Sequence, residues 1–465
     1  MPVVRQNISG WGNCPTESCL VTRPESRREL NAAVASSEFS SCIPRGLGRS
    51  YGDSALNREQ GVISLQRLNR LLAFDDVTGI VECEAGVSLH DLVQTFLPRG
   101  WFLPTTPGTQ FVTIGGAVAA DVHGKNHHVD GSLGNFVESF ELLTADGTVR
   151  HCTPAAAPDL FWATVGGMGL TGVIISVRLR LVPVESAYCR VTYQRCLNAD
   201  QLLEQIAATG SEHRYSVAWV DGLARGSGLG RSVLMSGNDA AAADLPATLR
   251  RRPLALPQHG TRSIPGYCPG WTLNAWSVKA FNAAYYAAHP DRQTLVDRQK
   301  FFYPLDHVQD WNRIYGRRGF VQYQALFPHQ TSRPGIVRLL ERISASRRAS
   351  FLAVLKSSGA ADPGWLSFLY PGHTLALDFP NTGADLRPFL NELDRIVLDH
   401  GGRLYLAKDA MTSAATLAEM YPRLPDFREL KAKIDPQGRF ASSQARRLGM
   451  VTEADQVRTF PRHAA

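Results

Sequence analysis

The sequence predicts an α+β protein of two domains. Its 465 residues exceed the roughly 150 that one domain commonly takes. Residues 1–184 hold short apolar strands separated by glycine turns, whereas residues 185–400 mix strands with amphipathic helices. We therefore expect one domain at 1–184 and a second at 185–400, built on a mainly antiparallel sheet with helices. A C-terminal segment, 401–465, is expected to return to the first domain.

Local patterns place the elements of the first domain. Residues 61–65 and 79–84 are mostly apolar or alternate between apolar and polar, which is typical of strands. A helix is expected over 89–96 with Ser88 as its N-cap, because a serine hydroxyl can bind the first free N–H groups of a helix. The apolar run at 172–184 is expected to form the last strand of this domain.

The second domain is expected to contain further strands and a clear amphipathic helix. Residues 385–400 carry their apolar side chains on one helical stripe. Glycine, proline, arginine and alanine are frequent at 222–272, so this stretch is expected to form long loops. Strands are expected at 215–220, 320–327, 351–356 and 374–379.

The composition is ordinary for a globular protein and excludes several classes. Hydrophobic residues make up 44% of the chain and charged residues 20%, which argues against disorder. No apolar run approaches the ~18 residues of a membrane-spanning helix, and the first residues form no apolar signal segment. The net charge of +7 is spread along the chain without a basic run that includes aromatics, so we expect no nucleic-acid partner.

The cysteines do not predict a metal site. None of the eight forms a C-x-x-C pair, and no histidine–cysteine cluster has the spacing of zinc ligands. We therefore expect mostly buried thiols in a reducing compartment.

Residues 44–53, PRGLGRSYGD, are the strongest functional signal. Closely spaced glycines allow left-handed backbone angles that turn successive N–H groups toward one point, and such a nest can hold a diphosphate. The spacing is G-x-G-x-x-x-G and no helix is expected to follow, so a dinucleotide-binding βαβ unit is not indicated. For this segment alone, an ordinary glycine turn is the alternative.

Three further segments add small residues, hydroxyls and imidazoles. They lie at 104–117, 120–128 and 161–174, and the second reads ADVHGKNHH. Small residues let a bulky ligand approach the backbone, and three imidazoles with an ammonium group within six residues are costly to bury without a purpose. The H-x-x-x-H-H spacing lacks acidic partners, so it predicts no metal site.

Together these four segments resemble the FAD-binding domain of the vanillyl-alcohol-oxidase (PCMH-type) flavoprotein superfamily. The run KAKIDPQGRF at 431–440 is similar to a K-x-x-x-D-P-x-x-x-F run near the end of these enzymes, so the resemblance covers nearly the whole chain. Within the superfamily, RGLGRSYGD, HGKNHH, LLTADG, FWATVGGMGLTG and GGRLYLAKD are most similar to the branch that oxidises decaprenylphosphoryl-ribose at C2′.

The resemblance implies FAD as the cofactor. Aldose and alditol oxidases of the superfamily commonly carry a histidine covalently bound to the flavin where this chain has Arg49, so the resemblance implies non-covalent FAD. It also implies FAD contacts from the glycine-rich segments and from a tyrosine near the C-terminus: Arg45, Gly46, Leu47, Gly48, Arg49, Ser50, Tyr51, Gly52, Asp53, Ser54, Gly108, Thr109, Thr113, Ile114, Gly115, Gly116, Ala120, Asp121, Val122, His123, Ile174 and Tyr405.

Two residues are expected to be catalytic. The resemblance implies that Lys408 lies at the flavin and is needed for activity, either stabilising reduced flavin or binding the substrate oxygen. A surface lysine is the alternative. An imidazole suits removal of the alcohol proton, so His123 is the candidate base, with a structural or substrate-binding role as its alternative.

Four polar residues are expected to bind substrate. A period of two places Gln322 and Gln324 on one face of a strand, and Lys356 ends another strand. The amides suit hydroxyl groups and the lysine suits a phosphate, although the amides equally suit a sheet edge and the lysine can reach water. The resemblance supports the pocket for these three and implies it for Lys125.

Two residues depart from the mycobacterial members of the branch. Ala376, expected at the substrate, stands where those members carry a cysteine, and Phe302 stands where they carry a tyrosine. No step of alcohol oxidation needs a thiol, so the change bears on pocket shape and on inhibitors that attach to that cysteine.

The resemblance implies oxidation of the C2′ hydroxyl of a polyprenyl-phosphoryl-β-D-ribose to the 2′-keto sugar, the first half of epimerisation to the arabinose donor for cell-wall polysaccharide. An NAD(P)H-dependent keto-reductase partner would complete the epimerisation. The alternatives are an FAD-dependent oxidase of a free aldose, alditol or sugar lactone, and a binding subunit that keeps FAD as a structural element. The expected location is cytoplasmic or peripherally membrane-associated, with the periplasmic face left open.

Overall fold

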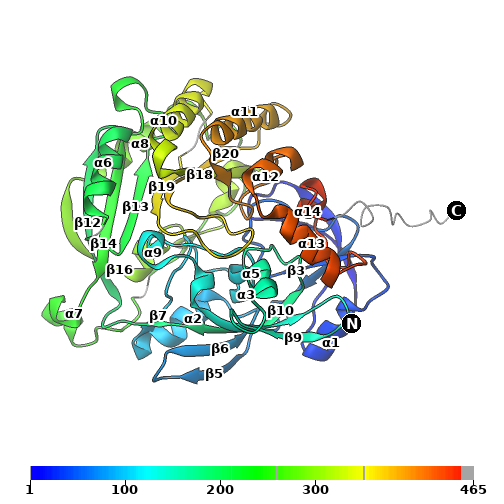
Figure 1. Ribbon diagram of the computed structural model, residues 1–465. Helices are drawn as coiled ribbons and strands as arrows, with labels where there is room; N and C mark the ends of the chain where they lie inside the picture. Colours follow the sequence, from blue (N-terminus) through cyan, green and yellow to red (C-terminus); the bar gives the residue numbers. More distant parts are fainter. Residues whose placement is uncertain (1, 211, 258, 349–350, 452–465) are drawn as a thin grey trace.

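The computed structural model describes residues 2–210, 212–257, 259–348 and 351–451 (Figure 1). The fold is mixed α+β, as predicted, with two small sheets from the N-terminal part and one large sheet from the middle of the chain. Figure 1 shows the large sheet standing beside the N-terminal sheets, with the last helices next to the N-terminal strands. These helices are α12 (Ala414–Met420), α13 (Leu424–Ile434) and α14 (Ser443–Arg447).

The N-terminal part forms a mixed four-stranded sheet, an antiparallel five-stranded sheet and a short ribbon. In order, the first holds β1 (Val4–Ser9), β2 (Thr16–Thr22), β4 (Gly61–Ser64) and β3 (Cys42–Arg45). The second holds β5 (Leu71–Asp75), β6 (Ile80–Glu84), β10 (Val173–Arg180), β8 (Val137–Leu143) and β9 (Val149–Cys152). The ribbon pairs β7 (Trp101–Phe102) with β11 (Val182–Pro183). The strand expected at 172–184 is thus divided, because the chain changes pairing partner after β10.

The N-terminal helices are short and connect these strands. The predicted capping of α2 (Leu89–Phe96) is confirmed: the Ser88 hydroxyl accepts a hydrogen bond from the Asp91 N–H, and the Asp91 carboxylate accepts one from the Ser88 N–H. The others are α1 (Arg27–Val34), α3 (Ile114–Ala119), α4 (His127–Asp130) and α5 (Pro158–Thr164).

The large sheet is antiparallel throughout and has eight strands. In order they are β16 (Arg292–Asp297), β12 (Tyr188–Cys196), β14 (Ser232–Asp239), β13 (Tyr215–Val220), β19 (Ala353–Ser358), β20 (Gly372–Pro380), β18 (Phe320–Pro328) and β21 (Arg403–Leu404). The four expected strands are present, with β19 beginning two residues later than expected. Helices α6 (Ala199–Thr209), α10 (His329–Ser346) and α11 (Leu386–Asp399) pack on one face of this sheet.

The expectation of long loops throughout 222–272 is wrong. Strand β14 lies inside the large sheet, hydrogen-bonded to β12 on one side and to β13 on the other. Its Ser236-Gly237-Asn238 run favours a turn locally, and pairing on both edges overrides that preference. The rest of the region contains α7 (Ala247–Arg250) and β15 (Arg262–Ser263), which pairs with β17 (Val308–Gln309); α8 (Ala275–Ala288) and α9 (Arg298–Phe302) follow.

The C-terminal segment packs against the N-terminal strands after β21. The Cys42 N–H donates to the Arg439 carbonyl (2.7 Å), and the Ala441 N–H donates back to the Cys42 carbonyl (3.1 Å). The Arg447 guanidinium bridges the carboxylates of Asp53 and Asp409 at 2.7 and 2.8 Å. The domain boundaries at 184 and 400 stay predictions.

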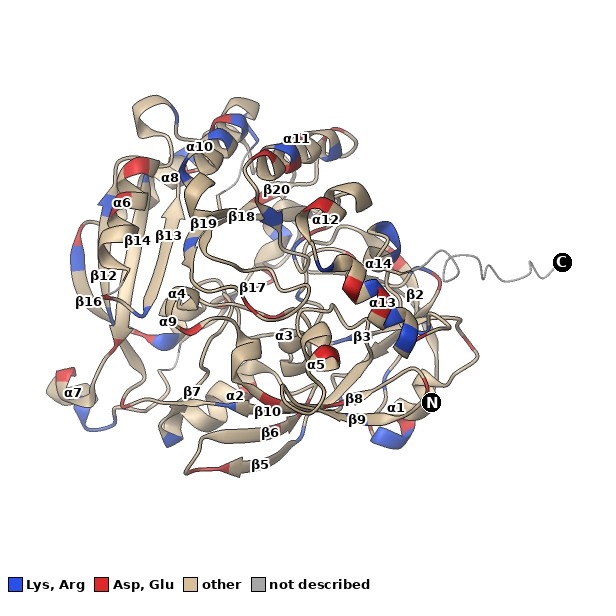
Figure 2. Cartoon of the chain, in the orientation of Figure 1, with Lys and Arg blue, Asp and Glu red and all other residues tan. Residues whose placement is uncertain are grey.

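Charges are interspersed over the fold. Figure 2 shows basic and acidic residues mixed along the helices and strands rather than gathered in one stripe. In the described part of the chain, no helix is long and apolar enough to cross a membrane.

Candidate active site

A cavity of about 860 Å³ lies between the glycine-rich N-terminal segments and the large sheet. This volume is at the upper end of the roughly 300–1,000 Å³ typical of small-molecule sites. The structure brings almost all of the predicted site residues to its wall. The exceptions lie behind the wall: Gly52, Asp53, Ile114 and Asp121.

The glycine-rich segments form a tight backbone wall at one end of the cavity. Gly48 has a φ of +66°, an angle that favours glycine. A Cβ atom on Gly46 would lie 2.1 Å from the Thr113 hydroxyl oxygen, which caps α3 by accepting from the Gly116 N–H (3.3 Å). A Cβ atom on Gly108 would have no other atom within 4 Å, so the backbone at this position is open to a ligand. This wall fits the diphosphate-containing cofactor that the sequence predicts.

Arg49 belongs to the same wall. Its Nη1 atom donates to the Leu47 carbonyl (2.8 Å), and its guanidinium carbon lies 4.4 Å from the centre of the Trp11 ring. Asp306, which the sequence did not single out, also lines the cavity, and its charge acts on Arg49. These contacts hold the arginine in place. A guanidinium group is a poor candidate for a covalent bond to a flavin.

The large sheet forms the cavity floor through alternate residues. Because successive side chains point to opposite faces of a strand, one set faces the cavity and the other packs under the covering helices. Gln324 lies opposite Ala376 in the register of β18 and β20, and Lys356 lies opposite Thr374 in that of β19 and β20. The predicted substrate residues on these strands therefore share one face.

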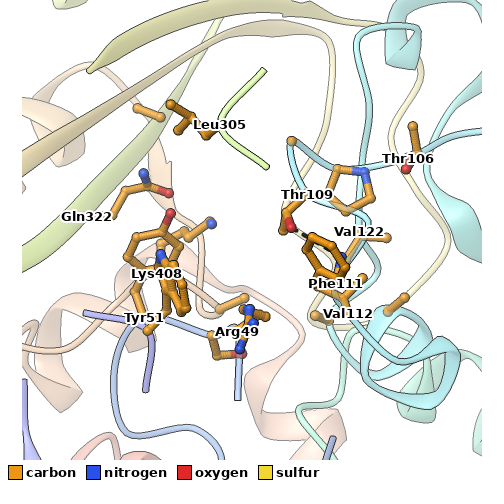
Figure 3. A pocket seen from close by; sticks show the side chains of 18 of the residues that line it. Arg49, Tyr51, Thr106, Thr109, Phe111, Val112, Val122, Leu305, Gln322 and Lys408 are labelled. Atoms are coloured by element: carbon orange, nitrogen blue, oxygen red, sulfur yellow. Dashed lines mark hydrogen bonds between the residues drawn. The ribbon is translucent and has the colours of Figure 1, made fainter. Parts of the chain in front are cut away.

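The polar end of the floor carries Lys408 and Gln322, with the buried carboxylate of Asp378 behind Gln322. The Lys408 ammonium lies 3.9 Å from the centre of the Tyr51 ring. Asp378 accepts a hydrogen bond from Gln322 Nε2 (2.6 Å) and another from the Tyr315 hydroxyl (3.0 Å). Figure 3 shows Lys408, Tyr51 and Gln322 together on one side of the pocket, across from Thr109, Phe111, Val112 and Val122.

Burial shifts the pKa values of these charged groups toward neutral pH. Desolvation lowers the pKa of Lys408 to about 7, a shift that Lys356 reinforces and Asp378 opposes. Desolvation also lowers the pKa of Lys125 to about 7 and that of Lys356 to about 8. The same cause raises the pKa of Asp378 to about 7. Each of these groups is therefore able to change its charge near neutral pH.

His123 is held beside the floor as a neutral imidazole. Its Nε2 atom lies 3.0 Å from Gln324 Nε2, and among the described residues its buried Nδ1 has no hydrogen-bond partner. Burial, with the nearby charge of Lys356, lowers the pKa of His123 well below its ordinary value. Lys125 is held differently, since its ammonium donates to the Phe301 carbonyl and lies 4.1 Å from the centre of that ring.

The opposite end of the floor is aromatic. The rings of Trp219 and Tyr285 lie 4.6 Å apart, and those of Phe281 and Phe351 lie 5.9 Å apart. Sequence analysis did not assign these residues, nor Asp378, to the site. Asp378 could have been found from the sequence, because it lies two residues after Ala376 on one strand and therefore shares its face. Further lining residues at this end are Tyr193, Val217, Met235 and Leu352.

No group of three potential metal ligands occurs within the part of the chain that the structure describes. The arrangement instead offers a cofactor-sized backbone cradle, a cluster of titratable lysines and a long apolar extension.

Comparisons with known proteins agree with this geometry. Residues 19–153 match the FAD-binding domain family, and residues 370–448 match the D-arabinono-1,4-lactone oxidase family. The chain is 39% identical over 457 residues to decaprenylphosphoryl-beta-D-ribose oxidase of Mycolicibacterium smegmatis, covering 97% of this chain and 99% of that protein. It is 26% identical to alditol oxidase of a Streptomyces species, covering 95% and 98%. It is 24% identical to L-gulono-1,4-lactone dehydrogenase of Mycobacterium tuberculosis, covering 94% and 98%.

Proposed function

The chain belongs to the family of FAD-dependent decaprenylphosphoryl-beta-D-ribose oxidases, and from this membership we propose that it oxidises the C2′ hydroxyl of a polyprenyl-phosphoryl-β-D-ribose to the 2′-keto sugar. When bound, FAD supplies the redox chemistry by accepting a hydride equivalent from C2′. The observation that supports this substrate is a single cavity in which buried lysines lie between a glycine-rich cradle and an aromatic extension.

The substrate phosphate binds at Lys356 in this proposal. Among the described residues, no side chain or carbonyl pairs with its ammonium group, and burial alone accounts for its lowered pKa. An anionic phosphate would restore the positive charge, which favours binding. Gln322 and Gln324 face the same side of β18 and hold the pentose hydroxyls, and Lys125 adds a second cation to the pocket.

Lys408 takes the hydroxyl proton. A catalytic base works best when its pKa lies near the operating pH, and burial brings the pKa of Lys408 to about 7. His123 contacts the alcohol as a neutral hydrogen-bonding group, because its strongly lowered pKa makes it a weak proton acceptor. Tyr51 positions the ammonium group of Lys408 through its ring.

The cradle residues of the glycine-rich segments hold FAD without a covalent bond, since an arginine occupies position 49. A separate NAD(P)H-dependent keto-reductase returns the 2′-keto sugar to the alcohol with inverted configuration. The lipid-linked substrate brings the enzyme to a membrane surface.

Anaerobic rapid mixing of the holoenzyme with a short-chain polyprenyl-phosphoryl ribose tests the proposal. We expect the flavin absorbance near roughly 450 nm to bleach, since the cofactor carries the redox change. Free pentoses, alditols and sugar lactones serve as controls, because the relatives include an alditol oxidase and a lactone dehydrogenase. Bleaching by a free sugar, and none by the lipid-linked one, would contradict the proposal.

A further inference from the structure

Four exposed aromatic side chains lie within 15 residues of sequence, between β15 and the middle of α8. The exposed fractions are 76% for Trp271, 82% for Trp276, 46% for Tyr267 and 45% for Phe281. We call these four residues the aromatic surface. Large aromatic side chains exposed together on a protein surface mark a binding site more often than isolated ones do.

Hydrogen bonds of Asn274 fix the backbone that carries the two tryptophans of the aromatic surface. Asn274 caps α8 by accepting hydrogen bonds from the N–H groups of Trp276 (2.8 Å) and Ser277 (3.1 Å). The Asn274 side chain also donates to the Trp271 carbonyl (2.9 Å), which fixes the turn that carries this tryptophan. The two tryptophans are therefore presented to solvent by ordered backbone.

The outer face of α8 is apolar along its length. Val278 and Asn282 are buried and fasten the helix, the latter by donating to Asp221 (2.6 Å). At about 100° per residue, the opposite side carries a stripe of exposed apolar residues. The stripe consists of Trp276, Ala280, Ala283 and Ala287. A surface helix of a soluble protein normally carries charges on this face, and Lys279 is the one charged residue of α8.

Basic residues lie beside the aromatic surface. No aspartate or glutamate occurs between Asp244 and Asp291. Lys279 stands on the helix beside Trp276, and the Arg317 guanidinium lies 5.7 Å from the centre of the Tyr267 ring. Tryptophan and tyrosine favour the interface between water and lipid, and cations favour anionic headgroups.

We propose that the aromatic surface and the outer face of α8 dock onto an anionic lipid bilayer. The helix connects this surface to the cavity, because Phe281 belongs to the aromatic surface and lines the cavity together with Tyr285. A polyprenyl chain can thus pass from the bilayer along the aromatic end of the floor to the lysines. Delivery of a polyprenyl chain from the bilayer to the cavity rests on the proposed function. Docking itself can be measured as vesicle binding, without any catalytic turnover.

Flotation of the holoenzyme with phosphatidylglycerol–phosphatidylcholine vesicles tests the proposal. We expect binding to these vesicles, little binding to phosphatidylcholine alone, and weakening as salt rises. The double variant Trp271→Gln/Trp276→Gln should bind at least about tenfold more weakly, because it removes both interfacial rings. Its matched control is Val77→Gln/Leu197→Gln, which removes two other exposed apolar side chains (85% and 66% exposed) and should bind like the parent.

A charge-reversed variant, Lys279→Glu/Arg317→Glu, keeps every aromatic ring and should lose the preference for anionic vesicles. FAD content and thermal unfolding check that each variant folds. Equal binding by the tryptophan variant and its parent would overturn the proposal, as would no vesicle binding by the parent.

The protein could instead dimerise in a concentration-dependent way that the tryptophan substitutions abolish, and show no vesicle binding. That result would show that this face binds a second copy of the chain and would contradict docking onto a bilayer. If no lipid-linked sugar reduces the flavin, the proposed function is contradicted. Vesicle binding in the same preparation would still support docking onto a bilayer. Flavin reduction by the short-chain substrate should be unchanged in the tryptophan variant, because neither tryptophan lines the cavity.

Discussion

The two ends of the cavity are built in different ways. The cofactor end consists mainly of backbone from the first third of the chain, where Gly46 and Gly48 allow close approach and Thr113 locks the wall. The reactive end consists of side chains from distant strands and loops, with Lys408 above Tyr51 and facing Asp378. The backbone wall can approach a ligand closely because its glycines lack side chains. The reactive end works instead through charged side chains that are buried away from water. The two ends should therefore fail differently when altered.

Loss of the ammonium group at the reactive end should have the largest effect. Lys408→Met should slow flavin reduction by about 100- to 10,000-fold, the usual contribution of a positioned catalytic base. Rapid mixing measures the rate, and flavin absorbance should show that FAD stays bound. Lys433→Met on exposed α13 is the control and should react like the parent. A Lys408→Met rate within a few fold of the parent would show that the reactive end lies elsewhere.

A side chain at the cofactor end should instead lower FAD binding. In Gly46→Ala the new methyl group would lie 2.1 Å from the Thr113 hydroxyl oxygen, so the wall must shift at a cost of about 1–3 kcal/mol. We expect FAD binding to weaken by roughly 5- to 150-fold, by titration of the apoprotein, since about 1.4 kcal/mol is tenfold. Gly260→Ala, where a Cβ meets nothing within 4 Å, should bind FAD normally. Equal affinity in both variants would argue against a close-packed cradle.

The pH profile should show that Asp378 acts through Lys408. With Lys408 as the base, the rate of flavin reduction should rise with pH through the lysine pKa of about 7. Asp378→Asn removes a negative charge that favours the ammonium form, so the rising limb should move to lower pH by about one unit. A purely structural role would lower the rate at every pH and leave the limb in place.

The stability of the apoprotein should also depend on the buried lysines. Between pH about 7 and about 8.5 the unfolded chain keeps these lysines protonated, whereas the native chain, with pKa values of about 7 to 8, releases protons. The unfolded state then binds more protons, so the free energy of unfolding should rise with pH, by roughly 1 kcal/mol per unit for each released proton. Within this window the carboxyls of Asp121 and Asp378 oppose part of the trend, because burial raises their pKa values to about 8 and about 7. Above this window the buried thiols oppose it as well, because burial raises their pKa values.

Urea unfolding at several pH values measures this slope. The slope should be smaller in Lys356→Met, which removes a titrating group. An equal slope in the parent and in Lys356→Met would contradict the lowered pKa of Lys356.

The smallest effect is expected from thiol reagents. Among the described residues, none of the cavity-lining side chains is a cysteine, and Ala376 occupies the floor beside Gln324. Intact mass spectrometry after treatment with a cavity-sized thiol reagent should show no adduct at the site in the parent and one new adduct in Ala376→Cys. Labelling of the parent within the cavity would show that the floor differs from the one described.

The sequence by itself determined the cofactor end and the local elements around it. The left-handed backbone angle of Gly48 and its close approach to Arg45 belong to neighbouring residues, and the Ser88 cap of α2 involves two residues three positions apart. Such features need no knowledge of distant chain segments, because the physical constraint lies within a few residues.

The family resemblance named Lys408, His123, Gln322, Gln324 and Lys356, but only the tertiary structure decided their contacts and pKa values, strand β14 and the outer face of α8. Asp378 and Tyr315 meet across 63 residues of sequence, and Gln324 reaches His123 across 201. Strand β14 exists because two neighbouring strands pair with its edges, against its local turn preference. The pKa values of the lysines arise from burial, which depends on every segment packed around them. Long-range pairing and desolvation are collective properties of the folded chain, and no local pattern encodes them.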